Sequence, residues 1–376
     1  MSLALVRQRY TPFGGAERFL ERAMAALQQE RGLQITLIAR RWSGDLSGWQ
    51  MLPCDRWHIG RWWRDRTFAR CVQRRLQEQR FDLVQSHERL PGCDLYRAGD
   101  GVHQVWLRER GRTDGWFGRL ATALSPYHRQ LLAMERQMMH SPQLRAVICN
   151  SRMVQREIQD CFAVAPEKLH VIYSGVDAER FHPQLAQRWR QEVRQQWSIA
   201  EKQIVLLLVG SGFERKGVPI ALQALARLPQ QFSLLVVGQD RALSAMQRQA
   251  ERLGVAERLR LTGGQRNVEA FYGAADILLL PTRYDPFPNV ALEGMAAALP
   301  LVTSHQCGAC DLIRHGENGL LGDSLDLERL LANIRVLQDG AERQRMGMAA
   351  RQTVLPLTLE AMSSRLLQLY RTLLQR

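Results

Sequence analysis

Two cations stand in a glycine-rich stretch where they could hold a phosphate. The stretch GSGFERKG, residues 210–217, follows the apolar run QIVLLLV, which is typical of a buried strand. Gly210 and Gly212 allow a tight turn and a close backbone approach, and a following helix offers N–H groups to an anion. Arg215 and Lys216 add mobile positive charge, and Lys216 is one of only three lysines in the 376 residues. The combination predicts a diphosphate site; a solvated pair of cations at a turn is the alternative.

Two acids separated by seven residues lie further along the chain, in TRYDPFPNVALEG. Asp285 follows the apolar run DILLLP, and Glu293 falls about one turn into a helix predicted to start near Pro288. The backbone N–H groups of Asn289 and Val290 could meet a phosphate, since they open that helix. A carboxylate can accept two hydroxyl hydrogen bonds, as a ribose diol or a sugar requires. The alternative is a pair of ordinary acids that are favourable near a helix N-terminus.

A third candidate group is the loop Gly99-Asp100-Gly101-Val102-His103. Asp100 could accept the proton of an attacking hydroxyl, and His103 could do the same or could hydrogen-bond a sugar. A structural role for either side chain is the alternative.

These candidates must be positioned by two series of alternating strands and helices. Short apolar runs such as ITLIA (35–39), FDLVQS (81–86) and FSLLVVG (232–238) are typical of buried parallel strands, and helical patterns separate them. The sequence predicts an α/β protein with domains at residues 1–180 and 181–355, followed by a helix over 356–376 that we expect to return to the first domain. Parallel sheets bind ligands at the carboxyl ends of their strands, where the glycine turns lie.

The composition indicates an anionic partner and a cytoplasmic location. The net charge is +14, and residues 56–80 hold eight arginines among Trp57, Trp62 and Trp63. Tryptophan beside arginine suits an anionic membrane surface, so we expect three exposed tryptophans and a peripheral contact with the inner membrane. A solvated helix with one buried stripe is the alternative. No apolar run is long enough to span a bilayer and no signal-peptide pattern opens the sequence.

The seven cysteines are scattered, and the only close pair is Cys307 and Cys310. One C-x-x-C without a second pair is weak evidence for zinc or for redox chemistry. We therefore expect free thiols in a reducing compartment.

At these residues the sequence resembles the retaining glycosyltransferases of family four, which share the GT-B fold. GSGFERKG and the acidic pair are most similar to the lipopolysaccharide-core glucosyltransferase branch. YTPFGGAERF and ERLPGCDLYRAGDGVH (88–103) are similar to the same branch. The resemblance extends over nearly the whole chain. It implies two Rossmann-like, doubly wound domains that face a central cleft, with the acceptor on the first and the nucleotide sugar on the second.

The family's motifs imply a role for each matching residue. The first acid of the family's Glu-x7-Glu motif contacts the donor sugar and the second binds the ribose, and these roles fall on Asp285 and Glu293. In the family, an arginine and a lysine of the glycine-rich loop hold the pyrophosphate, and the resemblance gives this role to Arg215 and Lys216. The first acid here is an aspartate, one methylene shorter than the usual glutamate, which leaves the identity of the donor sugar open.

Two further stretches gain a role from the resemblance alone. TGGQRNVEAFYGAADILLLP (262–281) is similar to the family's base-binding region, so backbone near Arg266 is expected to read a nucleobase, with uracil as the expected base. Gly14 and Gly15 are similar to the N-terminal glycine pair that approaches the diphosphate and the acceptor.

The resemblance implies a hexosyltransferase that uses UDP-glucose as its co-substrate, needs no metal ion or other cofactor, and acts on a lipid-linked glycan such as a lipopolysaccharide core. No second carboxylate is identifiable as a covalent nucleophile, so we expect front-face attack. One alternative is a Rossmann enzyme that modifies sugar nucleotides, but no G-x-G-x-x-G follows Leu3–Val6. Another is a nucleic-acid-binding protein, but no recognition-helix, RNP or zinc-finger pattern occurs.

Overall fold

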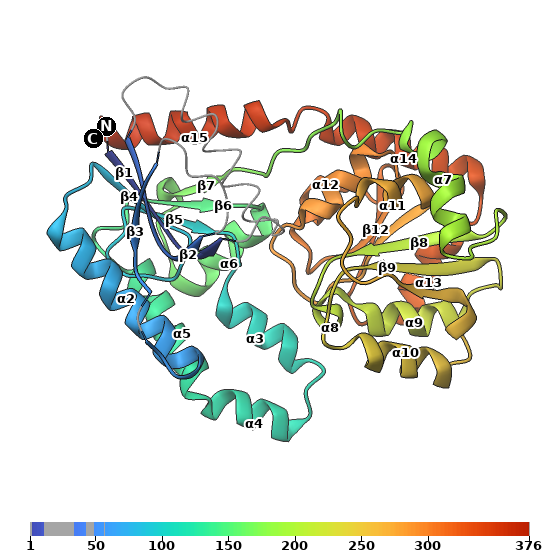
Figure 1. Ribbon diagram of the computed structural model, residues 1–376, viewed down its shortest axis with the longest axis horizontal. Helices are drawn as coiled ribbons and strands as arrows, with labels where there is room; N and C mark the ends of the chain where they lie inside the picture. The colour runs from blue at the N-terminus through green and yellow to red at the C-terminus, as the bar shows by residue number, and fades with distance from the viewer. Residues whose placement is uncertain (1, 11–33, 43–48, 56, 376) are drawn as a thin grey trace. The chain divides into compact units, whose positions relative to one another are not determined.

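The protein consists of two compact units, each built on a parallel sheet. The computed structural model describes residues 2–10, 34–42, 49–55 and 57–375. Gly14 and Gly15, the predicted N-terminal glycine pair, lie outside the described residues. Unit 1 contains Met1–Ser174 and Leu359–Arg376, and unit 2 contains Gly175–Thr358 (Figure 1).

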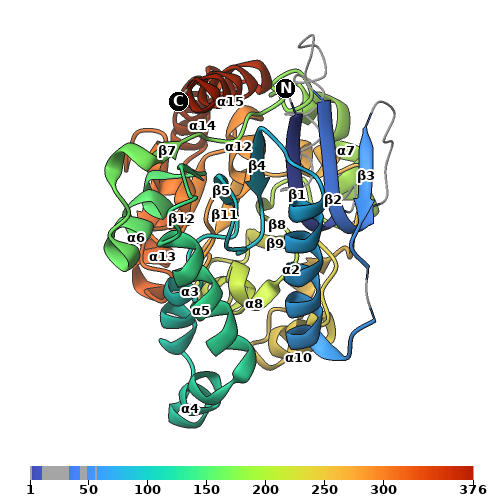
Figure 2. The same ribbon diagram turned by 90° about the vertical axis from the view of Figure 1, so that its left-hand side faces the viewer.

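In the described part of unit 1, seven parallel strands form one sheet in the order β3-β2-β1-β4-β5-β6-β7. The strands are β1 (Ser2–Tyr10), β2 (Gln34–Trp42), β3 (Gln50–Pro53), β4 (Leu83–Ser86), β5 (Leu95–Ala98), β6 (Ala146–Cys149) and β7 (Leu169–Val171). The described helices are α2 (Gly60–Glu78), α3 (His103–Gly111), α4 (Trp116–Leu124), α5 (Pro126–Met139), α6 (Arg152–Phe162) and α15 (Leu359–Leu374), with a 3₁₀ turn at Pro166–Lys168. Figure 2 shows β1 between β2 and β4, at the point where the strand order of a doubly wound sheet reverses.

The last helix, α15, completes the core of unit 1. Its buried side chains join the cluster that contains Leu3, Leu5 and Leu37; they are Met362, Leu366, Leu369, Tyr370 and Leu373. The Tyr370 hydroxyl donates a hydrogen bond of 2.5 Å to Oε1 of Gln85 in β4. Unit 1 is therefore assembled from two segments that are separated by the whole of unit 2.

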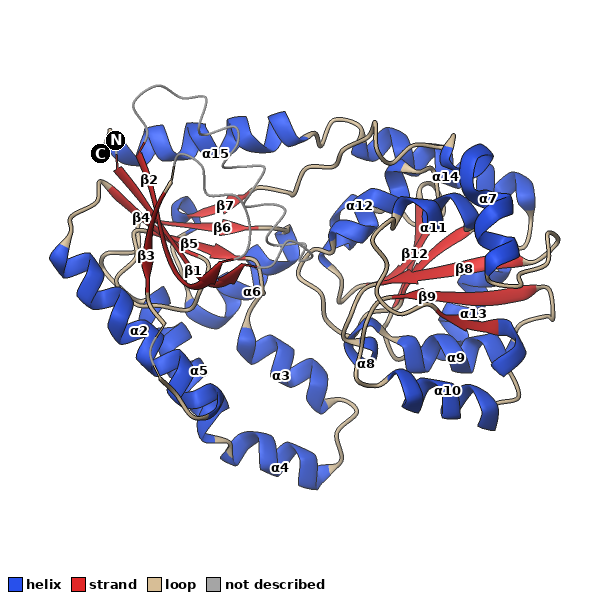
Figure 3. Ribbon diagram, in the orientation of Figure 1, coloured by secondary structure: helices blue, strands red, loops and turns tan. Residues whose placement is uncertain are grey.

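All residues of unit 2 are described, and its six parallel strands follow the order β10-β9-β8-β11-β12-β13. They are β8 (Ile204–Val209), β9 (Phe232–Val237), β10 (Leu259–Leu261), β11 (Ile277–Leu280), β12 (Leu301–Ser304) and β13 (Gly319–Gly322). The helices are α7 (Leu185–Gln196), α8 (Phe213–Lys216), α9 (Val218–Arg227), α10 (Leu243–Arg252), α11 (Glu269–Ala274), α12 (Asn289–Ala296), α13 (Leu327–Val336) and α14 (Gly340–Val354), with 3₁₀ turns at Ala256–Arg258 and Gly308–Leu312. Figure 3 shows α9 and α10 on one face of this sheet and α11 and α12 on the other. Every side chain of β8 and β9 is buried, which explains their continuous apolar sequences.

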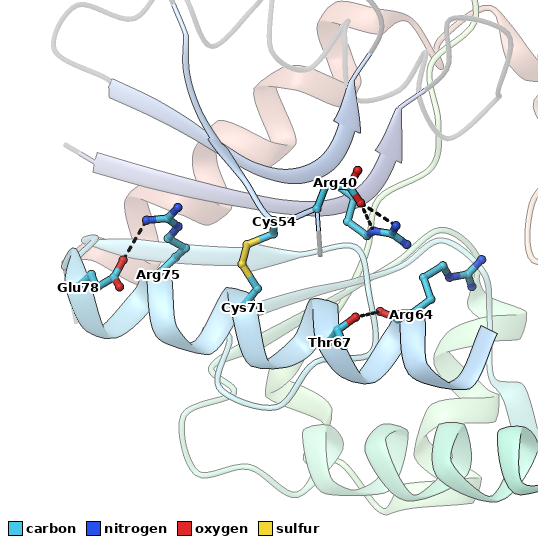
Figure 4. Close-up of a disulfide and its surroundings, with 8 residues drawn as sticks. Arg40, Cys54, Arg64, Thr67, Cys71, Arg75 and Glu78 are labelled. Carbon is cyan, nitrogen blue, oxygen red and sulfur yellow. Dashed lines mark hydrogen bonds and ion pairs between the residues drawn. A yellow bond between two sulfur atoms is a disulfide. The ribbon is translucent and has the colours of Figure 1, made fainter. Parts of the chain in front are cut away.

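A disulfide in unit 1 corrects the expectation that all cysteines are free thiols. Cys54, just after β3, is bonded to Cys71 of α2, and their Cα atoms lie 5.7 Å apart (Figure 4). The two cysteines are separated by 17 positions in the sequence, and the chain passes from the sheet into a helix that packs back beside it, which no spacing rule on the sequence reveals. Cys307 and Cys310 are thiols that take part in no disulfide.

The tryptophans at the start of α2 are not all exposed, contrary to the sequence-based expectation. Trp57 and Trp63 are 83% and 50% exposed. Trp62 is half-buried. Its ring centroid lies 4.8 Å from that of Trp63 in an edge-to-face arrangement, and Cζ of Arg66 lies 5.3 Å from the same Trp62 centroid. Within the described ranges, no helix is both long enough and apolar enough to cross a bilayer.

The glycine-rich turn after β8 is positioned by two close packing contacts. Gly217 has a φ of +83°, and a Cβ at this position would lie 2.1 Å from the backbone oxygen of Pro281. Gly210 has a φ of +131°, and a Cβ there would lie 3.1 Å from Cε of Lys216. Gly217 lets α8 and α9 approach the end of β11, and Gly210 leaves room for the Lys216 side chain.

We predict that Gly217→Ala destabilises the protein much more than Gly254→Ala. Both glycines have left-handed backbones, at φ +83° and +69°, so both substitutions carry a backbone cost of about 1–2 kcal/mol. Only Gly217 faces a backbone atom, whereas a Cβ at Gly254 would meet nothing within 4 Å. We therefore expect the free energy of unfolding to fall by roughly 2 kcal/mol more for Gly217→Ala, as measured by denaturant unfolding. Equal losses for the two variants would contradict the packing argument.

Candidate functional site

The two cations of the glycine-rich turn meet one acid of the predicted pair. Lys216 Nζ donates to Oδ2 of Asp285 at 2.7 Å, and Arg215 Nη1 donates to the same oxygen at 2.8 Å. Lys216 and Asp285 are 7% and 6% exposed, whereas the Arg215 side chain is 37% exposed. The structure thus brings Asp285 to two adjacent cations that lie about seventy positions earlier in the sequence, at the carboxyl ends of β8 and β11.

The charge of Asp285 is maintained by its neighbours. Burial alone would raise the pKa of this carboxyl, but the charges and hydrogen bonds of Lys216 and Arg215 outweigh burial and hold the pKa below its usual range. Asp285 is therefore ionised at neutral pH, and each cation has an anionic partner.

A second carboxylate, which the sequence analysis missed, holds the backbone of the turn. Oδ2 of Asp240, which follows β9, accepts hydrogen bonds from the N–H groups of Gly212 at 2.6 Å and Phe213 at 3.0 Å. Burial would raise the pKa of Asp240, but these and other backbone N–H donors lower it overall. The N–H groups of Gly212 and Phe213 are therefore engaged by a carboxylate of the protein itself. An acid three positions after the end of the neighbouring strand β9 was the available signal.

The second acid of the pair is oriented by a tyrosine. Glu293 lies in the second turn of α12 and is 8% exposed, and its Oε2 accepts a hydrogen bond of 2.8 Å from the Tyr272 hydroxyl. Asn289 and Val290, in the first turn of the same helix, are half-buried. Tyr272 lies in α11, and its role could not be inferred from spacing because nothing in the sequence links it to Glu293. Arg266 is exposed in the segment between β10 and α11.

In unit 1, His103 is the first residue of α3 rather than part of a loop. Its backbone N–H donates to the buried Glu135 at 3.0 Å, and its Nε2 lies 3.1 Å from Nδ1 of His128. Glu135 also accepts a hydrogen bond of 2.7 Å from Arg89, which in turn donates to the backbone oxygen of Gly101 at 2.9 Å. This network fixes the start of α3, and no local sequence pattern predicts that Glu135 or Arg89 takes part in it.

The two candidates in unit 1 have different chemical environments. Burial, with the positive charge of Arg89 and the neighbouring His128, lowers the pKa of His103 to about 3. A base of such low pKa accepts a proton poorly at neutral pH, so the neutral imidazole is suited to hydrogen bonding. Asp100 is exposed and lies two residues before Val102, the N-cap residue of α3. Among the side chains that the structure describes, no group of three or more His, Cys, Asp or Glu residues could hold a metal ion.

Comparison with known proteins identifies both halves of the chain. The family model for glycosyl transferases group 1 matches residues 190–353, and the model for Glycosyltransferase Family 4 matches residues 13–180. The chain is 28% identical over 326 residues to the lipopolysaccharide glucosyltransferase WaaG of Escherichia coli (strain K12), covering 85% of this chain and 84% of the relative. It is 32% identical over 282 residues to the glycogen synthase of Mycobacterium tuberculosis (strain H37Rv), covering 72% of this chain and 64% of the relative.

Solved structures show the same architecture. A crystal structure of WaaG, described as a glycosyltransferase involved in lipopolysaccharide biosynthesis, aligns with a TM-score of 0.84 at 26% identity and covers 98% of this chain and 99% of its own. Sucrose-phosphate synthase from Thermosynechococcus elongatus aligns with a TM-score of 0.80 at 20% identity and covers 99% and 98% of the two chains, which shows a shared fold. With a family 4 domain in the first part of the chain and a group 1 domain in the second, the protein belongs to the glycosyltransferases of GT-B fold.

Proposed function

We propose that this glycosyltransferase moves a hexose, with glucose as the first candidate, from a UDP-sugar to a lipopolysaccharide core or a related surface glycan. The observation that carries the proposal is the cation pair Arg215 and Lys216, held by Asp285 at the carboxyl ends of β8 and β11. The similarity to a relative named as a lipopolysaccharide glucosyltransferase supports the choice of donor sugar and acceptor.

The cation pair accounts for the first requirement of sugar transfer, a stable leaving group. When the bond between the anomeric carbon and the diphosphate breaks, negative charge develops on the phosphate oxygens. Preorganised cations at that position stabilise the transition state more than the ground state. In this proposal Arg215 and Lys216 neutralise the leaving diphosphate without a metal ion.

The remaining predicted residues supply orientation. We propose that Glu293, oriented by the Tyr272 hydroxyl, accepts hydrogen bonds from the ribose hydroxyls. We also propose that the N–H groups of Asn289 and Val290, in the first turn of α12, face a phosphate. Backbone near Arg266 remains the proposed contact for uracil. In unit 1, the exposed carboxylate of Asp100 is the proposed acceptor of the hydroxyl proton, and neutral His103 is a hydrogen-bond partner for a sugar. Retention of configuration by front-face attack completes the proposal.

We predict that Lys216→Ala lowers transfer by roughly a hundredfold or more while the protein stays folded. Lys202→Ala is the matched control, because Lys202 is an exposed lysine of the same unit. The measurement is nucleotide release from UDP-glucose and from other UDP- and GDP-sugars in the presence of a lipopolysaccharide-core acceptor, with circular dichroism to verify the fold. Near-normal turnover of Lys216→Ala would contradict the phosphate role, and no release from any donor by the unaltered protein would contradict the proposed function.

Helix α4 gives the proposed membrane contact a broader basis than the tryptophans of α2. None of its nine residues is buried, and its large apolar side chains are exposed by 66%, 68%, 48% and 56%; they are Trp116, Phe117, Leu120 and Leu124. Figures 1 and 2 both place α4 at the end of unit 1 that is farthest from the sheet. We therefore propose that α4 and the exposed Trp57 and Trp63 meet the inner face of the cytoplasmic membrane.

Positive charge beside α4 is complementary to anionic lipid. A hollow of about 510 Å³ next to this helix is lined by one aspartate, Asp114, and by four arginines, Arg108, Arg112, Arg119 and Arg129. Nε of Arg119 donates to the backbone oxygen of Gly111 at 2.8 Å, so this guanidinium is held at the hollow. Apolar insertion next to phosphate-binding cations is the usual chemistry of an interfacial helix.

We predict that replacing both Trp116 and Phe117 by Ser weakens binding to vesicles that contain anionic phosphatidylglycerol by roughly tenfold, because two aromatic side chains no longer leave water. Val336→Ser is the control, since Val336 is 48% exposed on unit 2. Vesicle co-sedimentation at fixed salt measures the effect. Equal binding by the double variant and the control would remove α4 from the proposed contact.

A further inference from the structure

The contact between Asp285 and the cation pair differs from the role that the family resemblance gives this residue. That role is to hold hydroxyls of the donor sugar. In the structure, one oxygen of Asp285, Oδ2, accepts hydrogen bonds from both Lys216 and Arg215. The cations proposed to hold the diphosphate are thus engaged by a carboxylate of the protein itself.

The backbone holds this carboxylate firmly in place. The N–H of Asp285 donates to the backbone oxygen of Gln306 at 3.0 Å, and the N–H of Gly308 donates to the oxygen of Asp285 at 2.8 Å. The segment before Asp285 is also bonded to the turn that carries the cations. The backbone oxygen of Arg215 accepts hydrogen bonds from the Arg283 N–H at 2.8 Å and the Thr282 hydroxyl at 2.9 Å. An aspartate has only two side-chain torsions, so with its backbone fixed the carboxylate stays within reach of the cations.

The burial of Lys216 explains why such an anion is needed. An ammonium that is 7% exposed loses most of its hydration and is stable as a cation only beside a negative partner. Asp285 supplies that partner before any nucleotide arrives. The two cations and the carboxylate carry a net charge of about +1, whereas a diphosphate brings several negative charges to the same groups.

We propose that Asp285 is a positioning residue, an internal counter-ion that holds Lys216 and Arg215 ready and competes with the diphosphate of the nucleotide for them. This inference rests on the proposed function, because it assigns the diphosphate to the same cation pair. When the nucleotide binds, its phosphate oxygens take over part of the contact with the cations. When it leaves, the carboxylate regains the contact in full, which favours release of the product.

The test measures the affinity for UDP, which has the diphosphate but no donor sugar. Isothermal titration calorimetry at fixed ionic strength compares the unaltered protein with Asp285→Asn, Asp285→Glu and Glu214→Gln. Glu214 is the matched control, because it lies on the same short helix but pairs with Arg283 at 2.7 Å instead of with the cation pair.

Competition predicts a specific pattern of dissociation constants. Asp285→Asn removes the competing charge, so UDP binds roughly tenfold more tightly and raises the melting temperature more than it does for the unaltered protein. Asp285→Glu keeps the charge and restores an affinity close to that of the unaltered protein. Glu214→Gln leaves the affinity unchanged. Turnover of Asp285→Asn falls, because the cations are no longer held in place and the product leaves slowly.

Other results would overturn the inference. If Asp285 contacts only the donor sugar, all three variants bind UDP as the unaltered protein does. Weaker binding of UDP by Asp285→Asn would show that the carboxylate does not compete with the diphosphate. If Asp285→Asn fails to fold, Lys216→Met combined with Asp285→Asn is examined, since it leaves no unpaired buried charge. Folding of this double variant supports the counter-ion role, and its failure to fold contradicts it. Failure of the proposed function is distinguishable, because the unaltered protein would then bind no nucleotide.

Discussion

A buried ion pair, Lys216 with Asp285, is the interaction on which the arrangement of unit 2 around its candidate site depends. Removing Asp285 would leave Lys216 as an uncompensated charge in a site where each is less than a tenth exposed, whereas removing Lys216 leaves Asp285 paired with Arg215. The pair joins the turn after β8 to the segment after β11, so two neighbouring strands are tied together at their carboxyl ends. The sheet below is apolar and closely packed, and the ion pair places charge at its edge.

The turn that carries Lys216 is shaped by complementary constraints. Asp240 fixes the N–H groups at one end of the turn, and Gly217 permits close packing against Pro281 at the other. Each of these constraints comes from a different strand of the sheet. The parallel architecture therefore does more than support the site, because it delivers carboxylates and glycines from distant parts of the chain to one edge.

The sequence predicted most of the apolar strands, since their patterns are local. β8, β9 and β11 have continuous apolar runs, and the glycine turn follows β8 as expected. β3, β5 and β13 were not predicted, because β3 is short and exposed at both ends, β5 carries a buried arginine, and β13 begins and ends with glycine. The roles of Asp240, Tyr272 and Glu135 and the Cys54–Cys71 bond depend on contacts between residues that are distant in sequence or in separate elements, which no local pattern reveals.

The contribution of α15 to unit 1 has a consequence for how the molecule is made. Residues 359–374 follow the whole of unit 2 in the chain, yet they close the core around β1. During translation, unit 2 can fold as soon as it has left the ribosome, whereas the first half of unit 1 waits with an uncovered apolar face until the final helix is synthesised. A growing chain thus completes unit 2 first, and unit 1 becomes complete only afterwards.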